Sequence, residues 1–286
     1  MEGFAKKKIL LTGSNGLLGQ KIVYALRNRD DVLLIATSKG SNRLSEKSGY
    51  IYEVLDIIDR SQVEKIISDY SPDVIINTAA MTNVDACETK QEECRQLNVE
   101  SVRNMISFFS NSKLQTPYSK QFIHLSTDFV FDGSNGPYRE EDKPNPQSFY
   151  AHSKYDAEKI IQLSEIPWTI IRTIIIYGVS EDVTRSNLVL WTLKSLKKGE
   201  RIRVINDQFR APTLSEDLAA ACASAAMKKK TGIFHVSGIE TKSPFDRFCQ
   251  STERSLGGRI STKISQCVRS DKVRVFARFG NQRRSP

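Results

Sequence analysis

The feature that most constrains the fold is an alternation of short apolar runs with helical segments along residues 8–177. Runs rich in β-branched residues recur at residues 8–12, 32–36, 73–77, 122–126 and 169–177. Segments with helical character lie between them, at residues 13–29, 62–69, 92–110 and 150–163. Continuous apolar runs of this length are typical of strands that a parallel sheet buries on both faces, with the connecting helices as cover. The pattern therefore predicts an α/β fold with a doubly wound parallel sheet.

A glycine-rich turn follows the first predicted strand directly and opens the first predicted helix. It reads Thr12-Gly13-Ser-Asn-Gly16-Leu-Leu-Gly19, with the spacing GxxGxxG rather than GxGxxG. Glycines in such a turn permit a tight bend, close approach of the backbone to a pyrophosphate and close packing of helix on strand. The helix N-terminus adds free N–H groups that bind an anion. The turn predicts a Rossmann-type dinucleotide site with contacts from Gly13, Asn15, Gly16, Leu17 and Gly19.

The residues after the second predicted strand bear on which nicotinamide cofactor the chain uses. An acidic residue there would hold the ribose 2′-hydroxyl and repel a 2′-phosphate, whereas this chain has Ser38, Lys39 and Arg43. A hydroxyl and two cations favour NADPH, although both cations can equally be solvated loop charges, and NADH is left open. Asp56 is expected to accept a hydrogen bond from the adenine amine. The predicted cofactor contacts are completed by Ala79, Ala80 and Thr82.

Tyr150 and Lys154 stand four residues apart, which places them on one face of a predicted helix. A free tyrosine, with a pKa of about 10, is a poor proton donor at neutral pH. A lysine ammonium beside it, with the positive charge of an oxidised nicotinamide, would lower that pKa. Thr127, at the carboxyl end of the fourth predicted strand, can orient a carbonyl group. Thr127, Tyr150 and Lys154 are therefore the candidate catalytic residues, and Tyr150 and Lys154 also count as cofactor contacts.

Beyond residue 177 the predicted elements are shorter and less regular. Helices are predicted at residues 187–198 and 215–227, and strands at residues 201–205 and 232–236. Late additions to a dinucleotide fold usually build a small lobe over ligands at the carboxyl ends of the strands. We therefore assign residues 1–179, with 207–230 returning to them, to the nucleotide-binding domain. Residues 180–206 and 231–286 are assigned to a smaller C-terminal substrate-binding lobe.

Positive charge is concentrated at the C-terminal end of the chain. Residues 246–286 hold ten Lys or Arg and three acidic residues, so they carry most of the net charge of +9. A nearly neutral body argues against a nucleic-acid surface. Apolar runs fall short of the roughly 20 residues that span a bilayer, and the N-terminus lacks a signal-peptide pattern. We expect a cytoplasmic protein without nucleic-acid or membrane partners, and a homodimer is compatible with the sequence.

The five cysteines and three histidines are scattered along the chain and form no CxxC pair. Structural metal sites need clustered ligands, and disulfide frameworks need regularly paired cysteines. We therefore expect free thiols and no metal site.

Taken together, the motifs resemble those of dTDP-4-dehydrorhamnose reductase, a family in the extended short-chain dehydrogenase/reductase superfamily. The resemblance covers about residues 6–245 and rests on residues 13–19, 77–85, 97–99, 126–131, 150–154 and 207–213. It implies that Thr127, Tyr150 and Lys154 form the catalytic triad, and that Asn98 supports the site. It also implies a sugar-nucleotide pocket lined by Asp128, Phe129, Val130, Asn187 and Arg210. Alternatively, Asn98 could bond only backbone within its helix, and Asp128 could cap a turn.

The reaction implied by the resemblance is hydride transfer from NADPH to the 4-keto carbon of a nucleotide-linked deoxysugar. Tyr150 would donate the proton, Thr127 would polarise the carbonyl and Lys154 would hold the ribose. The implied partner is thus a nucleotide-sugar substrate. The tail, residues 247–286, departs from the family because it is Arg- and Ser-rich with little amphipathic period.

Three other functions stay open. A 4,6-dehydratase of this superfamily usually carries Asp-Glu after the threonine, but Phe129 follows Asp128 here. A 4-epimerase holds NAD, which suits an acidic residue after the second strand better than Ser38 and Lys39. A non-catalytic NADP-binding regulatory subunit, like the β subunit of methionine adenosyltransferase, shares the motifs and differs only in turnover.

Overall fold

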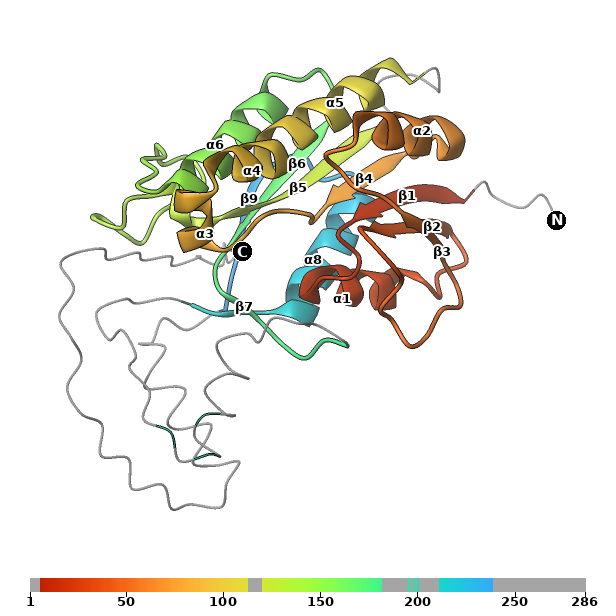
Figure 1. The fold of residues 1–286 in the computed structure, drawn as a ribbon, viewed down its shortest axis with the longest axis horizontal. Helices are drawn as coiled ribbons and strands as arrows, with labels where there is room; N and C mark the ends of the chain where they lie inside the picture. The colour runs from red at the N-terminus through yellow and green to blue at the C-terminus, as the bar shows by residue number, and fades with distance from the viewer. Residues whose placement is uncertain are drawn as a thin grey trace, which may run out of the picture.

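A parallel sheet of seven strands forms the centre of the computed structural model, which describes residues 6–112, 120–181, 195, 198, 200 and 211–238. The strand order is β3-β2-β1-β4-β5-β6-β9 (Figure 1). The strands are β1 (Lys7–Thr12), β2 (Val32–Ser38), β3 (Ile51–Val54), β4 (Val74–Asn77), β5 (Gln121–Thr127), β6 (Trp168–Thr173) and β9 (Gly232–Val236). Every neighbouring pair is parallel. The doubly wound sheet predicted from the sequence is confirmed.

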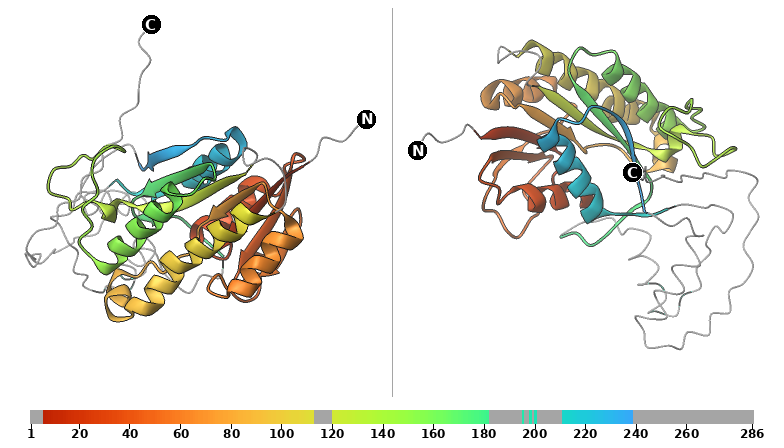
Figure 2. Two further views of the ribbon diagram at one scale, coloured as in Figure 1. Left: turned by 90° about the horizontal axis from the view of Figure 1, so that it is seen from above. Right: turned by 180° about the vertical axis from the view of Figure 1, so that it is seen from behind.

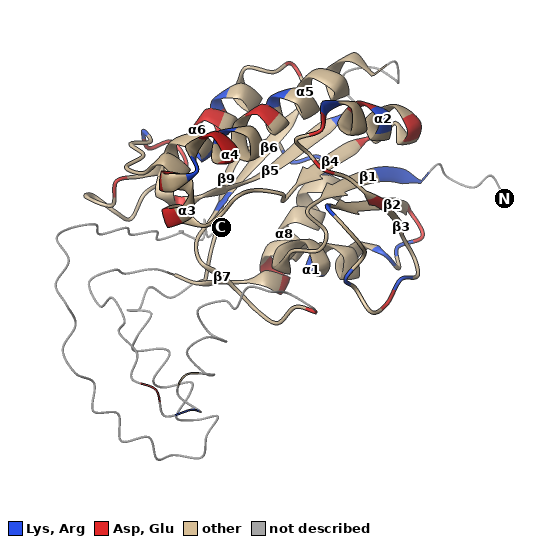
Figure 3. Ribbon diagram, in the orientation of Figure 1, with Lys and Arg blue, Asp and Glu red and all other residues tan. Residues whose placement is uncertain are grey.

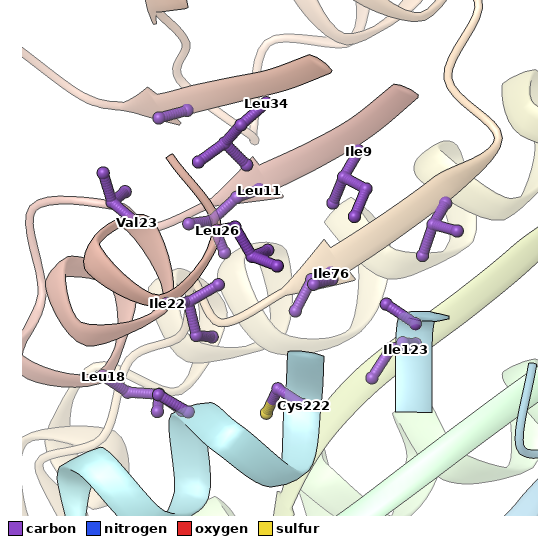
Figure 4. Packing of buried hydrophobic residues seen from close by; sticks show 14 of the residues in the cluster. Ile9, Leu11, Leu18, Ile22, Val23, Leu26, Leu34, Ile76, Ile123 and Cys222 are labelled. Atoms are coloured by element: carbon purple, nitrogen blue, oxygen red, sulfur yellow. The ribbon is translucent and has the colours of Figure 1, made fainter. Parts of the chain in front are cut away.

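Helices cover both faces of the sheet (Figures 1 and 2). On one face lie α1 (Leu17–Leu26) and α8 (Ser215–Lys228), which run side by side in the view from behind. The other face carries α2 (Arg60–Tyr70), α5 (Ser101–Asn111) and α6 (Phe149–Gln162). Alternate strand residues supply the two cores: Ile9 and Leu11 face α1, whereas Leu10 faces the opposite layer. Figure 4 shows the α1 layer, with Ile22 and Cys222 among the packed side chains.

The last described strand, β9, belongs to this main sheet. It pairs in parallel with β6, with Thr169 opposite Gly232 and Thr173 opposite Val236. We assigned residues 231–286 to the substrate-binding lobe, and for this strand the assignment is wrong. The physical reason is that α8 packs beside α1 and works as a crossover helix, which returns the chain to the open edge of β6. The rest of the proposed lobe, residues 180–206 and 239–286, falls almost wholly outside the described residues.

Two predicted elements are divided in the structure. The run at residues 169–177 ends as β6 at Thr173, and β7 (Ile176–Tyr177) then pairs with β8 (Thr213–Leu214) in a separate small sheet. The predicted helix at residues 92–110 consists of α4 (Gln91–Arg95), a π-helix η1 (Gln96–Glu100) and α5. A short helix, α3 (Val84–Thr89), precedes it. Single π-helical turns inside a helix often occur at functional sites.

The segment that leaves β7 is fastened to the first helix. The side chain of Gln20, which is 1% exposed, donates a hydrogen bond to the Glu181 carbonyl at 2.7 Å and accepts one from the Glu181 N–H at 2.8 Å. The Glu181 carboxylate in turn accepts hydrogen bonds from the Tyr24 hydroxyl and from the Ser45 N–H. These hydrogen bonds hold Glu181 beside α1, close to the glycine-rich turn.

The outer helices carry both signs of charge. Figure 3 shows Lys and Arg interleaved with Asp and Glu on α2, α4 and α6. Several of these charges form ion pairs one turn apart, such as Arg95 with Glu92 and Lys159 with Asp156. Within the described ranges, helices long and apolar enough to cross a membrane are absent.

Candidate active site

The glycine-rich turn joins β1 to α1 and has no room for side chains at two of its glycines. Gly13 has φ of +75°, and a Cβ there would lie 2.8 Å from the Ala79 nitrogen. A Cβ on Gly19 would lie 2.7 Å from the Ser14 Cα, because α1 packs directly on the turn. Gly16 caps α1 without a side-chain hydrogen bond, so the first N–H groups of the helix stay available to an anion. This geometry fits a dinucleotide pyrophosphate.

Asn15 joins the glycine-rich turn to the loop after β2. Its side-chain nitrogen donates to the Ser41 carbonyl at 2.9 Å and to the Tyr52 hydroxyl at 3.1 Å. Its side-chain oxygen accepts a hydrogen bond from the Arg43 N–H at 3.0 Å. Asn15 was predicted to contact the cofactor, but its side chain is committed to protein contacts. It instead fixes the backbone of Arg43 beside the turn.

Lys39 and Asp56 form an ion pair, with 2.7 Å between Nζ and Oδ2. The sequence suggested separate roles for them, at a 2′-phosphate and at an adenine amine. Both follow adjacent strand ends, since Ser38 ends β2 and the neighbouring β3 ends at Val54. The carboxylate raises the pKa of Lys39, whose side chain is 79% exposed. An ion pair this exposed is weak, and a phosphate group can compete for the lysine.

The loop after β4 carries Ala79, Ala80 and Thr82, and Asn98 holds this loop in place. The Asn98 side chain accepts a hydrogen bond from the Met81 N–H at 2.8 Å and donates one to the Met81 carbonyl at 3.0 Å. It also donates to the Ser153 hydroxyl on α6 at 3.0 Å. Asn98 lies within the π-helix η1. It therefore bonds well beyond its own helix, and it links the predicted cofactor loop to the helix of Tyr150.

Tyr150 and Thr127 meet at the carboxyl end of β5. Ser148 caps α6, and Tyr150 lies in the first turn of that helix, 8% exposed. Its hydroxyl lies close enough to the Thr127 side chain for Thr127 to influence its pKa. The Phe129 ring packs edge-on against the Tyr150 ring, with 6.0 Å between ring centroids. Lys154 lies one helical turn further along α6, is 3% exposed, and places Nζ 3.0 Å from the His124 Nε2.

Burial dominates the protonation equilibria of these groups. It raises the pKa of Tyr150, and the nearby Thr127 side chain only partly opposes this effect. Our expectation of a lowered tyrosine pKa concerns the lysine together with the positive charge of an oxidised nicotinamide. In the protein alone, desolvation of the phenolate outweighs the other effects. Burial also lowers the pKa of Lys154 to about 8, against the opposing attraction of Glu158. Tyr150 thus holds its proton at neutral pH.

A buried ion pair supports α6 beneath the site. Arg172 on β6 donates two hydrogen bonds to the Glu158 carboxylate, at 3.0 and 2.7 Å, and both side chains are almost fully buried. Ser126 on β5 donates a further hydrogen bond to Glu158 at 2.5 Å. These contacts fix α6 to β5 and β6 one turn beyond Lys154. Sequence reasoning missed them, because no local motif connects the three residues.

The residues predicted to line a sugar-nucleotide pocket lie in different surroundings. Asp128 and Phe129 begin a 3₁₀ turn (Asp128–Val130) after β5, and the Asp128 carboxylate accepts a hydrogen bond from the Thr127 hydroxyl at 3.1 Å. Val130 is fully buried against Phe131 and Tyr138, so its side chain packs in a core. Asn187 and Arg210 lie outside the described residues.

Comparisons with known proteins agree with this architecture. A family described as the RmlD substrate binding domain matches residues 7–262, which reaches into the tail that the motif resemblance left out. The spore coat polysaccharide biosynthesis protein SpsK of Bacillus subtilis (strain 168) is 32% identical over 231 residues, covering 80% of this chain and 73% of that protein. Methionine adenosyltransferase 2 subunit beta of Bos taurus is 29% identical over 248 residues, covering 85% and 70%.

Solved structures give a similar result. A hypothetical dTDP-4-dehydrorhamnose reductase from Sulfolobus tokodaii superposes with a TM-score of 0.73 and 32% identity, covering 87% of this chain and 82% of that one. A dTDP-4-dehydrorhamnose reductase from Bacillus anthracis str. Ames, in complex with NADP, gives 0.77 at 24% identity, covering 96% and 89%. WbmG of Bordetella bronchiseptica, in complex with NAD and UDP, gives 0.81 at 18% identity, covering 96% and 86%. The last two likenesses concern the fold alone.

Proposed function

Because the chain belongs to the RmlD substrate binding domain family, in the extended short-chain dehydrogenase/reductase superfamily, we propose that it reduces the 4-keto group of a nucleotide-linked deoxysugar with NADPH. The observation that carries the proposal is the buried Tyr150, which lies beside Thr127 at the carboxyl end of β5 and one helical turn from the buried Lys154. In open α/β sheets, ligands bind at this edge. The glycine-rich turn after β1 lies at the same edge of the sheet, because all seven strands are parallel.

The cofactor would lie along the carboxyl ends of β1, β2 and β4. The open N-terminus of α1 would hold the pyrophosphate, with Gly13, Gly16 and Gly19 giving it room. Lys39 and Arg43 would meet the 2′-phosphate, and Lys39 would then exchange Asp56 for a phosphate oxygen. Ala79 and Ala80 would pass close to the cofactor beyond β4. The glycine-rich turn and the open N-terminus of α1 support a dinucleotide cofactor, and the two cations favour NADPH.

When bound, NADPH supplies the hydride that reduces the 4-keto carbon. Thr127 would donate a hydrogen bond to the keto oxygen, which polarises the carbonyl and stabilises the developing alkoxide. Tyr150 would donate its proton to that oxygen, and its raised pKa ensures that the proton is present. Lys154 would hold the ribose, and its ammonium would stabilise the phenolate that the transfer leaves behind. The product is a secondary alcohol, and Tyr150 regains its proton from solvent.

The test is NADPH oxidation, followed at 340 nm, against a panel of 4-keto nucleotide sugars. We expect turnover with at least one of them, and loss of turnover in Tyr150→Phe. Tyr155→Phe is the matched control, since Tyr155 lies on the same helix, next to Tyr138 and Phe131 rather than Thr127. If no 4-keto sugar in the panel supports NADPH oxidation, the reductase assignment is wrong.

A non-catalytic regulatory role is the second candidate, and the likeness to methionine adenosyltransferase 2 subunit beta favours it. A regulatory subunit would bind the dinucleotide without needing Tyr150. NADPH binding with no turnover, unchanged in Tyr150→Phe, is the result that this candidate predicts. Burial of Tyr150 and Lys154 together favours the enzyme, because a desolvated lysine lowers stability and needs a functional reason.

A further inference from the structure

A row of polar side chains crosses three neighbouring strands and ends at Lys154. Thr12 on β1 lies opposite Asn77 on β4, and Asn77 lies opposite His124 on β5. The Thr12 hydroxyl donates a hydrogen bond to the Asn77 side-chain oxygen at 2.6 Å. The Asn77 side-chain nitrogen lies 3.1 Å from the His124 Nδ1, and the His124 Nε2 lies 3.0 Å from the Lys154 Nζ.

This row is buried next to an apolar stretch of the same face of the sheet. Thr12, Asn77 and His124 are each at most 1% exposed. Two residues earlier on the same strands, the same face carries Leu10, Ile75 and Phe122. A buried polar side chain costs stability unless it is hydrogen-bonded, and apolar residues would suit this face better. The cost in stability suggests that the row serves a function, and the row ends at Lys154.

We propose that His124, braced by Asn77 and Thr12, is the positioning residue for Lys154: a neutral imidazole that fixes the amine at the carboxyl edge of the sheet. The role of Lys154 in catalysis rests on the proposed function, but the contact with His124 does not. An amine on a flexible four-carbon stem needs a fixed partner to hold one position. Glu158 does not serve as that partner, because Arg172 and Ser126 already bind its carboxylate.

The hydrogen bonds link the His124 tautomer to the charge of Lys154. An ammonium group has donors only, so beside it Nε2 must accept and the imidazole proton lies on Nδ1. Nδ1–H then needs an acceptor, which the Asn77 amide supplies by turning its oxygen toward the ring. An uncharged amine allows the other arrangement, with the proton on Nε2 and the Asn77 nitrogen donating to Nδ1. The imidazole holds one proton in both arrangements.

The titratable groups around this pair come from three elements. Glu158 on α6 and Cys94 on α4 act on the pKa of Lys154, and Lys154 acts on the pKa of His124 on β5. Burial keeps the pKa of His124 well below its ordinary range, and the neighbouring lysine lowers it further. Lys154 is therefore the member of the pair whose charge changes between neutral and mildly alkaline pH, with a pKa of about 8.

The first test is ¹⁵N NMR of the histidine rings in the full-length protein, which has only three histidines. His152, exposed on α6, serves as an internal reference, and His124→Gln assigns the His124 signals. We expect His124 to stay neutral from pH 6 to 9 and to change tautomer as Lys154 loses its proton. In Lys154→Met the tautomer should be independent of pH. A His124 that becomes protonated near pH 6.5, or that is unaffected by Lys154→Met, overturns the proposal.

The second test uses turnover. We expect kcat to fall at alkaline pH, as Lys154 loses its charge. His124→Leu removes the acceptor and makes the ammonium less stable, so this fall should move to lower pH by about one unit. His124→Gln keeps an acceptor near the position of Nε2 and should retain the wild-type profile. The control is His152→Gln, which changes an exposed histidine on the helix that carries Lys154. A folded His124→Leu with an unshifted profile contradicts the proposal. If wild-type protein reduces no keto sugar, the proposed function fails, and the NMR result still decides the His124 contact.

Discussion

The cofactor end and the catalytic end of the candidate site differ in how far their charged side chains are exposed to water. At the cofactor end, the Lys39–Asp56 ion pair and the loop near Arg43 lie at the surface, and the anion site consists of backbone N–H groups. At the catalytic end, Tyr150, Lys154 and the ion pair of Glu158 with Arg172 are buried. Exposed charges bind a cofactor reversibly at little cost to the fold. Burial instead shifts pKa values, which the proposed proton transfer needs.

The largest expected effect comes from removing the phenol at the buried end. Tyr150→Phe should lower kcat by roughly 10²–10⁴-fold, the usual contribution of a positioned general acid. Its dissociation constant for NADPH should stay close to that of wild type, because the hydroxyl acts in proton transfer rather than in anchoring. Steady-state kinetics and a fluorescence titration measure the two quantities. A variant that keeps more than about a tenth of the wild-type rate shows that Tyr150 is not the acid.

Breaking the buried ion pair tests whether the fold supports the site as described. Arg172→Leu leaves the Glu158 carboxylate buried without its cation, which should lower the free energy of unfolding by about 3–5 kcal/mol. Lys159→Ala breaks the exposed pair with Asp156 on the same helix and should cost less than about 1 kcal/mol. Urea denaturation of both variants gives the comparison. If both variants lost the same free energy of unfolding, burial would not make the Arg172–Glu158 pair more important for stability than the exposed pair.

The lysine at the buried end should make stability depend on pH. The pKa of Lys154 is lowered from 10.5 to about 8 by folding, so between these values the unfolded chain binds one more proton than the folded one. The free energy of unfolding of wild type should therefore rise with pH in this window, by up to about 1.4 kcal/mol per unit relative to Lys154→Met. Denaturation at pH 7.5, 9 and 10.5 measures the difference. A difference that stays constant with pH would place Lys154 in water.

The smallest expected effect lies at the exposed end. Changing Lys39 and Arg43 together to Ala should weaken NADPH binding by roughly 1–3 kcal/mol, as for lost charge-assisted hydrogen bonds, and leave NADH almost unaffected. Calorimetric titration with each dinucleotide separates the two. Asp56→Asn is the useful companion variant, since it frees Lys39 from its ion pair and should strengthen NADPH binding slightly. Similar losses for NADPH and NADH would remove the argument for a 2′-phosphate contact.

Features that depend on local spacing were predictable from the sequence. The glycine-rich turn and the pair of Tyr150 and Lys154 are defined within a few residues, and buried strands show as continuous apolar runs. The strand β3 was not predicted, because an edge strand with the half-exposed pattern of Ile51–Val54 has no such run. The assignment of β9 to the substrate-binding lobe was wrong, because a strand's sequence does not specify which neighbour the strand pairs with.

Contacts between distant segments could not be predicted. His124 meets Asn77 and Lys154, which are 47 and 30 residues away. The register of β4 and β5 brings it to Asn77, and the packing of α6 on β5 brings it to Lys154. A single histidine in an apolar run gives no sign of its partners. Arg172 and Glu158 are similar, because an arginine inside the run at residues 169–177 suggests a buried partner without identifying it.

The central claim is that this chain moves a hydride from NADPH to a sugar carbon, with the proton supplied by Tyr150. The most direct measurement is isotope transfer: NADPH labelled with deuterium at the nicotinamide C4 is incubated with 4-keto nucleotide sugars, and the product is analysed by mass spectrometry and NMR. We predict one deuterium at C4 of the reduced sugar with wild type and with Tyr155→Phe, and transfer roughly 10²–10⁴-fold slower with Tyr150→Phe. Tight NADPH binding with all deuterium retained on the cofactor, across the whole panel, would contradict the claim.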